Sequence, residues 1–117
     1  MVVADAGTYE VERHGNVVVV RLLGEHDIST SSQVMAELDS HINEGIVVSL
    51  TETEFIDSSI VHALWNTDGR LRKRNSGLVL HVATASIVQR VLELSGLSTA
   101  LPCTGSLDEA LEFARTR

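Results

Sequence analysis

The chain has 117 residues, of which 44% are hydrophobic and only 3% aromatic, and its formal net charge is −7. This length and composition predict one globular domain with an aliphatic core and exclude a disordered chain. The negative charge argues against a nucleic-acid-binding protein, which needs a basic face for phosphate contacts. The one basic cluster, Arg70 to Arg74, is typical of a solvated helix end, with a docking patch for an acidic partner as the alternative.

The chain carries no signal of export or membrane insertion. A single cysteine, Cys103, allows no disulfide within the chain, which favours a reducing compartment. Residues 1–7 lack the basic region and apolar run of a signal peptide, and we expect them to be frayed. No apolar stretch approaches the roughly 20 residues that a membrane span needs. These features predict a cytoplasmic protein.

The chain opens with a predicted hairpin. Residues 8–12 alternate between polar and apolar side chains, which is typical of a strand with one wet face. Residues 17–23 form a β-branched run, typical of a central strand that is covered on both faces. His14-Gly15-Asn16 is a turn signal between them, so the two strands are expected to pair.

Helices and strands then alternate. The first helix is predicted to start with a capping box of Thr30 and Gln33 and to end at Gly45 in the left-handed conformation. The later elements are a strand at 46–50, a helix from about 58 to 75, a strand at 78–82, a helix behind the Ser86/Gln89 box, a possible edge strand near Pro102 and a helix behind the Ser106/Glu109 box. This order predicts an α/β fold in a single domain at residues 8–115: a mixed sheet of four to five strands, with an initial hairpin and then parallel neighbours, flanked by four helices.

No pattern for metal binding or catalysis is present. The five histidines are scattered, and none has a metal-ligand spacing with a nearby acid or cysteine. There is no Gly-x-Ser-x-Gly elbow, no phosphate-binding glycine loop and no dinucleotide fingerprint. The sequence therefore favours a binding module without metal or cofactor. A small enzyme with Ser58 or Cys103 as nucleophile is a distant alternative.

Two polar loops, at residues 24–32 and 51–59, each follow a strand and precede a helix. If the two strands are parallel neighbours, both loops lie at the edge where open α/β sheets place their functional sites. The second loop places Asp57, Ser58 and Ser59 where a strand meets a helix, and hydroxyls there can cap backbone N–H groups. The alternative is that both loops are simply well-capped helix starts.

These residues resemble a known family. The run Phe55-Ile56-Asp57-Ser58-Ser59, after Ile46 to Leu50, resembles the signature of STAS domains, and of bacterial anti-sigma factor antagonists in particular. The segment Arg21 to Asp27 resembles a second landmark, a Gly-acid-x-Asp turn before the first helix. Residues 77–80, 94–97 and 106–111 also fall where that family has comparable segments, so the resemblance covers roughly residues 8 to 115.

The resemblance implies a small mixed sheet flanked by helices and a regulatory function in transcription. Family members bind an anti-sigma factor and free a sigma factor. The anti-sigma factor is typically a serine kinase that phosphorylates the second serine of the motif, here Ser59, with Ser58 as the second choice. Phosphorylation ends binding, and a phosphatase restores it. The implied partner-binding surface comprises Asp27, Ser29, Asp57, Ser58, Ser59 and His62.

The chain departs from the family pattern at two positions. Ile60 stands where the family usually has glycine after the serines, and Ser49 stands where its strand usually has aspartate. The isoleucine adds weight to a second hypothesis, in which the chain is a STAS subunit of another assembly, such as a lipid-transport ATPase complex or a stress-signalling scaffold, whose members need not be phosphorylated.

Overall fold

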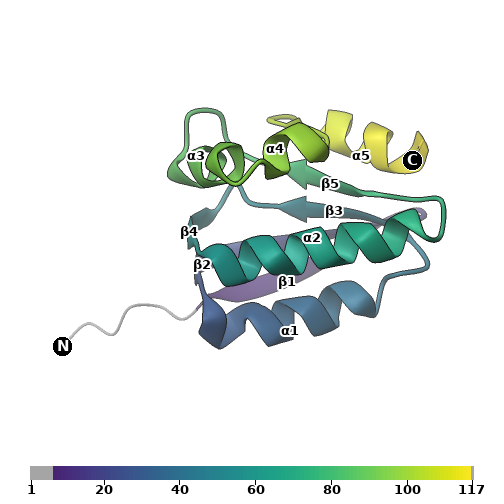
Figure 1. Cartoon of the computed structure of the whole chain (residues 1–117). Coiled ribbons are helices and arrows are strands. Elements are labelled where there is room, and N and C mark those ends of the chain that lie inside the picture. Colours follow the sequence, from purple (N-terminus) through teal and green to yellow (C-terminus); the bar gives the residue numbers. More distant parts are fainter. Residues whose placement is uncertain (1–6, 117) are drawn as a thin grey trace.

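A computed structural model describes residues 7–116 of the chain. Strands and helices follow one another through the whole of this range (Figure 1). In chain order they are β1 (Thr8–His14), β2 (Val17–His26), α1 (Ile28–Asp39), β3 (Gly45–Ser49), β4 (Thr53–Ile56), α2 (Ser58–Arg72), β5 (Leu78–His81), α3 (Ile87–Leu94), α4 (Leu97–Ala100), β6 (Cys103–Thr104) and α5 (Leu107–Thr116).

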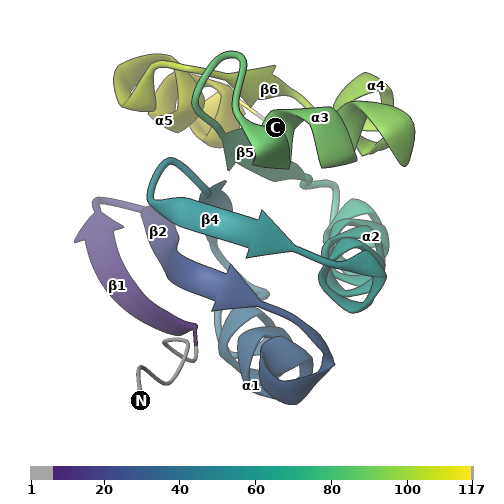
Figure 2. The same ribbon diagram turned by 90° about the vertical axis from the view of Figure 1, so that its left-hand side faces the viewer.

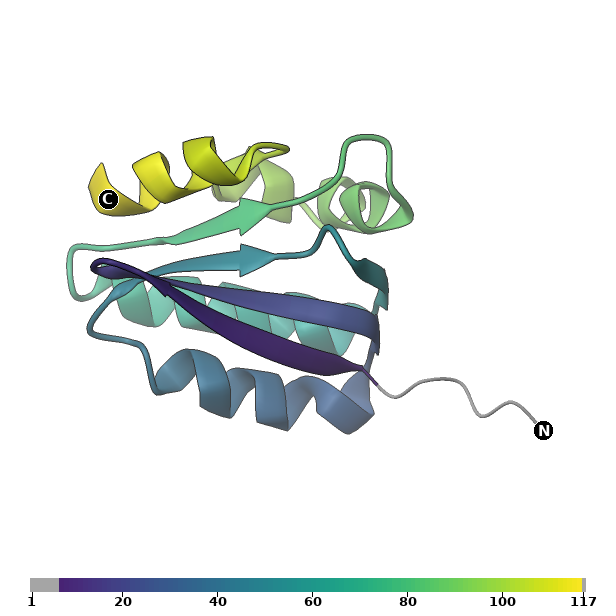
Figure 3. The same cartoon turned by 180° about the vertical axis from the view of Figure 1, so that it is seen from behind.

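The strands form one mixed, six-stranded sheet. Its order is β1-β2-β3-β5-β6, and β4 pairs with the end of β2 beside this path. The hairpin pair β1–β2 is antiparallel, and all other neighbours are parallel. Helices α1 and α2 cover one face of the sheet and α5 covers the other (Figures 2 and 3). The predicted α/β class, the initial hairpin and the parallel neighbours are confirmed.

Strand β2 lies between β1 and β3 and supplies apolar side chains to both faces of the sheet. Val18, Val20 and Leu22 enter the larger core under α1 and α2. Val17 and Val19 enter the smaller core under α5. Because successive side chains of a strand point to opposite faces, a strand that is covered on both must be apolar throughout. This explains the four consecutive valines from residue 17 to residue 20.

The sheet and the helix set are each larger than predicted. Strand β4 lies inside what the sequence presents as a polar loop. Its first and last residues, Thr53 and Ile56, are buried, and Glu54 and Phe55 between them are exposed. Its pairing with β2 is secured by the Thr53 hydroxyl, which donates to the Leu22 carbonyl at 2.7 Å. Only the contact with β2 makes this polar segment a strand, so its own composition does not predict it.

The stretch after Gly96 is expected to connect two elements. It contains the short helix α4, which is the helix beyond the four that were predicted. It is a single turn that buries Leu97. Gly96 ends α3 with a φ of +82°, a conformation that glycine adopts without strain. The predicted edge strand is present as β6, directly after Pro102.

The start and end of α1 differ from the prediction. The cap is Asp27, and Thr30 is the third residue of the helix, whose hydroxyl accepts from the Asp27 backbone N–H at 3.2 Å. Gly45 is not a left-handed helix stop. It is the first residue of β3, and its N–H donates to the Asn16 carbonyl at 3.1 Å. Thr30–Gln33 is therefore not the capping box; Asp27–Thr30 is.

The other two predicted caps are confirmed. The Ser86 hydroxyl accepts from the Gln89 N–H at 3.0 Å, and the Ser106 hydroxyl accepts from the Glu109 N–H at 3.2 Å. Of the N-terminal segment predicted to be frayed, residues 1–6 lie outside the described range. Gly7 is packed so closely that a β-carbon there would lie 2.5 Å from Nε2 of His26.

Candidate functional site

The two polar loops meet at one edge of the sheet. His26, the last residue of β2, pairs with Ile56, the last residue of β4. The backbone N–H of Asp57 then donates to the His26 carbonyl at 3.3 Å. Helices α1 and α2 therefore begin side by side, at Ile28 and Ser58 (Figure 2). The condition set in the sequence interpretation, that the strands before the two loops are parallel neighbours, is met by β2 and β3.

The two helix starts have the same geometry. Asp57 Oδ1 accepts hydrogen bonds from the Ser59 backbone N–H at 2.9 Å and from its hydroxyl at 2.5 Å. Asp27 Oδ1 accepts from the Ser29 N–H at 2.8 Å and from its hydroxyl at 2.5 Å. The helix caps are therefore the aspartates, and the serine hydroxyls donate to them rather than capping the helices themselves. The repeated Asp-x-Ser spacing was a signal that the sequence interpretation missed.

The two serines of α2 face different hollows. Ser59 is half-buried and lines a hollow of about 400 Å³ between α1 and α2, beside Met35. Ser58 is exposed and lines a hollow of about 530 Å³ between α2 and α3, where Trp65 and other apolar side chains form the wall. His62 borders both hollows and is itself exposed. The six predicted site residues therefore gather around the starts of α1 and α2.

The two departures from the family pattern both point into the protein. Ile60 is fully buried and belongs to the larger core, so it takes no room from the outer surface. Ser49 is also fully buried, and its hydroxyl lies 3.0 Å from Nδ1 of His81. Burial lowers the pKa of His81, so Ser49 meets the neutral imidazole at neutral pH. Both side chains therefore lie below the outer surface of the site.

The site is anionic. Hydrogen bonds from the Ser29 hydroxyl and backbone N–H lower the pKa of Asp27, which keeps its carboxylate charged. Residues 24–33 and 52–63 contain no lysine or arginine. The carboxylates in these two segments belong to Glu25, Asp27, Glu52, Glu54 and Asp57. A partner or a phosphate at this edge therefore meets negative charge.

His26 holds the base of the site, a role that the sequence interpretation did not assign. It is fully buried, with Nδ1 3.0 Å from the Thr30 hydroxyl. Its Nε2 lies 3.0 Å from the Thr8 carbonyl and 3.1 Å from the Leu23 carbonyl. The ring thus joins the start of β1, the end of β2 and the first turn of α1, and a histidine inside the Gly-acid-x-Asp turn was its only sequence signal.

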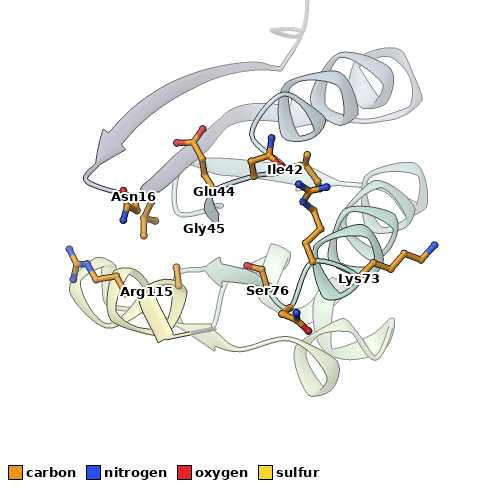
Figure 4. Close-up of a pocket in the computed structure, with 12 residues that line it drawn as sticks. Asn16, Ile42, Glu44, Gly45, Lys73, Ser76 and Arg115 are labelled. Atoms are coloured by element: carbon orange, nitrogen blue, oxygen red, sulfur yellow. The ribbon is translucent and has the colours of Figure 1, made fainter.

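The basic cluster lies at the opposite end of the molecule. Arg70 pairs with Asp39 and Arg72 with Asp68, each at 2.6 Å. Lys73 and Arg74 line a hollow of about 980 Å³ at the starts of β2 and β3, together with Arg115. Figure 4 shows Lys73 and Arg115 directed away from this hollow rather than into it. The Lys73 and Arg115 side chains therefore do not point toward a common position in this hollow.

Within residues 7–116, no group of three histidine, cysteine or acidic side chains is placed to hold a metal ion. In the same range, no helix has the length and apolar character needed to cross a bilayer.

Comparisons with known proteins agree with the geometry. A family model described as "Mlab, STAS domain" matches residues 9–104. An anti-sigma F factor antagonist of Paenibacillus polymyxa is 34% identical over 97 residues, which cover 80% of this chain and 82% of that protein.

Solved structures are similar over nearly the whole chain. An anti-sigma factor antagonist from Mycobacterium paratuberculosis is 28% identical with a TM-score of 0.81, covering 93% of this chain and 94% of that one. The Bacillus cell fate determinant SpoIIAA in its phosphorylated form is 26% identical with a TM-score of 0.66, covering 94% of this chain and all of that one.

Proposed function

This chain belongs to the STAS domain family, and from that premise we propose that it is an anti-sigma factor antagonist whose binding is ended by phosphorylation of Ser59. The partner is an anti-sigma factor with serine-kinase activity, and a phosphatase reverses the modification. The protein acts by binding, as a regulator of transcription, and not as an enzyme. The name of the Paenibacillus relative and that of the mycobacterial structure support this function.

The proposed partner surface is the edge formed by the starts of α1 and α2, with Asp27, Ser29, Asp57, Ser58, Ser59 and His62. These residues come from two neighbouring loops that the parallel pairing of β2 and β4 holds in fixed register. Both helix starts are capped, and His26 anchors the first. A surface that is ordered before binding loses little conformational entropy when a partner docks.

The hydrogen bond from Ser59 to Asp57 is the observation that carries the choice of Ser59. The hydroxyl donates its proton to Oδ1 at 2.5 Å, which fixes the side-chain rotamer and leaves the oxygen lone pairs free to attack a phosphoryl group. Ser58 is more exposed, but its hydroxyl has no such acceptor among the described residues. The structure of SpoIIAA in its phosphorylated form also supports phosphorylation in this fold.

A phosphate on Ser59 changes the surface without requiring a new fold. It adds a charge of about −1.5 to −2, which the start of a helix tolerates. It also removes the proton that Ser59 donates to Asp57 and sets two anions side by side on a surface that already lacks lysine and arginine. A partner fitted to a neutral hydroxyl must now desolvate this charge, and each loss of about 1.4 kcal/mol weakens binding tenfold.

The first test is recovery of the partner. The full chain, used as bait in a lysate of its host, should retain an ATP-binding anti-sigma factor, which is then purified and bound to the full chain in isolation. Recovery of transporter subunits or a stress-signalling scaffold in its place would contradict the proposal and favour the second hypothesis from the sequence.

The second test locates the phosphate. Incubation with the purified anti-sigma factor and ATP should add one phosphate to the wild type and to Ser58→Ala, and none to Ser59→Ala. Ser29→Ala is the matched control, because Ser29 donates to Asp27 with the same geometry, and it should still be phosphorylated. A phosphate that persists in Ser59→Ala and disappears in one of the other two variants would place the switch there.

A further inference from the structure

Ile28 is an apolar side chain that the fold leaves outside. It is 76% exposed, the largest value among the large hydrophobic residues of the described range. It is the first residue of α1 and stands between the capping Asp27 and Ser29. A β-branched residue adds nothing to helix stability at an exposed position, because its side-chain rotamers are restricted there. Its conformation and exposure therefore give no structural reason for isoleucine at this position.

Its position within the site is well defined. Ile28 follows the cap of α1 as Ser58 follows the cap of α2, and the two helices begin side by side. The serine and the isoleucine thus occupy equivalent places on adjacent helices, at the edge that we propose as the partner surface. An exposed apolar side chain at such a place is suited to fill a pocket on a partner, and such buried anchors carry much of the binding energy of an interface.

The charge around Ile28 indicates which kind of side chain surrounds the pocket on the partner. Asp27 directly precedes it, and Glu25 and Glu54 are exposed on the two strands that lead into the site. Neither segment of the site contains a lysine or arginine that could neutralise them. The complementary partner surface is an apolar hollow with lysine or arginine at its rim.

We propose that Ile28 is the specificity anchor of this chain: it enters an apolar pocket on the anti-sigma factor whose rim is basic. The proposal rests on the function proposed above and adds the residue and the chemistry by which the partner is chosen. The rim charges attract the whole anionic edge over several ångströms, whereas a phosphate on Ser59 must be desolvated at contact. Attraction at long range and release by phosphate are therefore compatible.

The test measures binding of the purified host anti-sigma factor to the full-length chain and its variants. Ile28→Ala should weaken binding at least tenfold, mainly through faster dissociation. Ile87→Ala is the matched control, since Ile87 is also the first residue of a helix, α3, and is 69% exposed; it should bind within twofold of the wild type. Both variants should melt at the wild-type temperature.

Two further variants test the basic rim. Ile28→Lys should bind more weakly than Ile28→Glu, because the added cation meets the cations of the partner. The wild-type Kd should rise with salt concentration. In kinase assays, Ile28→Ala should raise the KM for the chain and leave kcat unchanged, because Ile28 lies on α1 and the phosphate acceptor on α2.

The outcomes separate the two proposals. If the wild type binds and Ile28→Ala binds equally well, Ile28 is not an anchor, while the proposed function stands. Equal losses in Ile28→Ala and Ile87→Ala would show general apolar adhesion and also overturn the anchor. If the wild-type chain binds no anti-sigma factor, the proposed function fails and the anchor fails with it.

Discussion

At the scale of single residues, the two aspartates of the site have a structural role as well as the proposed one in binding. Each uses one carboxylate oxygen to hold the start of its own helix. A partner must therefore contact the other oxygen or the neighbouring side chains. This dual use means that alanine variants of Asp27 and Asp57 lose stability and binding together, so asparagine, which also caps helices well, is the better probe of charge.

Asp27 should make stability depend on pH. Its pKa is lowered in the folded state from an ordinary value of 3.8, so its contribution is complete above that value and is lost as the pH falls through the lowered pKa. Asp27→Asn removes the titrating group. The difference in unfolding free energy between wild type and Asp27→Asn, measured by urea denaturation, should be constant near pH 7 and change as the pH falls below 3.8. A difference that is independent of pH over this range would contradict the hydrogen-bonded carboxylate.

Ile60 should contribute to the stability of the fold and not to the shape of the proposed partner surface. Ile60→Gly, which restores the usual family residue, empties a fully buried position of the larger core and places glycine in a helix. The expected loss is about 3 to 5 kcal/mol in the free energy of unfolding. Ile87→Gly, at an exposed helix position, should lose about 1 kcal/mol or less. Equal losses in the two variants would show that Ile60 is not packed in the core.

At the scale of elements, a buried carboxylate connects α2 to the next strand. The Asp68 side chain is 3% exposed, accepts from the Leu78 backbone N–H at 2.9 Å and pairs with Arg72. The bond to Leu78 fixes where β5 begins after the turn that ends α2, and so it sets the register of a central strand.

Asp68→Ala should therefore be costly. It leaves the buried Leu78 N–H without its acceptor, and the expected loss is about 2 to 4 kcal/mol in urea unfolding. Asp39→Ala is the control, because Asp39 also pairs with an arginine of α2 but is 47% exposed, and it should lose less than about 1 kcal/mol. Hydrogen exchange at Leu78 should accelerate in the first variant alone. Unchanged exchange in Asp68→Ala would exclude this role.

At the scale of the whole molecule, the two hydrophobic cores lie on opposite faces of the same strands. Strands β2, β3 and β5 contribute side chains to both. Neither core can be lost while the other remains, because the strands that they share would have to stay in place. Unfolding should accordingly be cooperative.

The chain should unfold in one transition. Trp65 on α2 is the only tryptophan and reports on the face covered by α1 and α2, while far-UV circular dichroism reports on all helices and strands. The two signals should give the same urea midpoint and the same slope. An earlier transition in circular dichroism, without a change in Trp65 fluorescence, would indicate that α5 detaches on its own.

Comparison of prediction and structure shows which features are local. The hairpin, the covered strand β2 and the caps at Ser86 and Ser106 followed from periodicity and from short-range cap patterns. The family resemblance also rests on short segments in a fixed order. Such features depend on residues close together in the chain, so the sequence alone determines them.

The remaining features depend on neighbours that are distant in the chain. Polar residues 53–56 form a strand only because β2 offers them a partner, and Ile60 is harmless to the surface only because helix α2 turns it into the core. Ile28 and Ile87 are exposed where an average isoleucine is buried. Sequence determined the class of fold and the position of the candidate site; the tertiary structure decided which of its side chains are exposed, because burial is set by packing between elements and not by residue type.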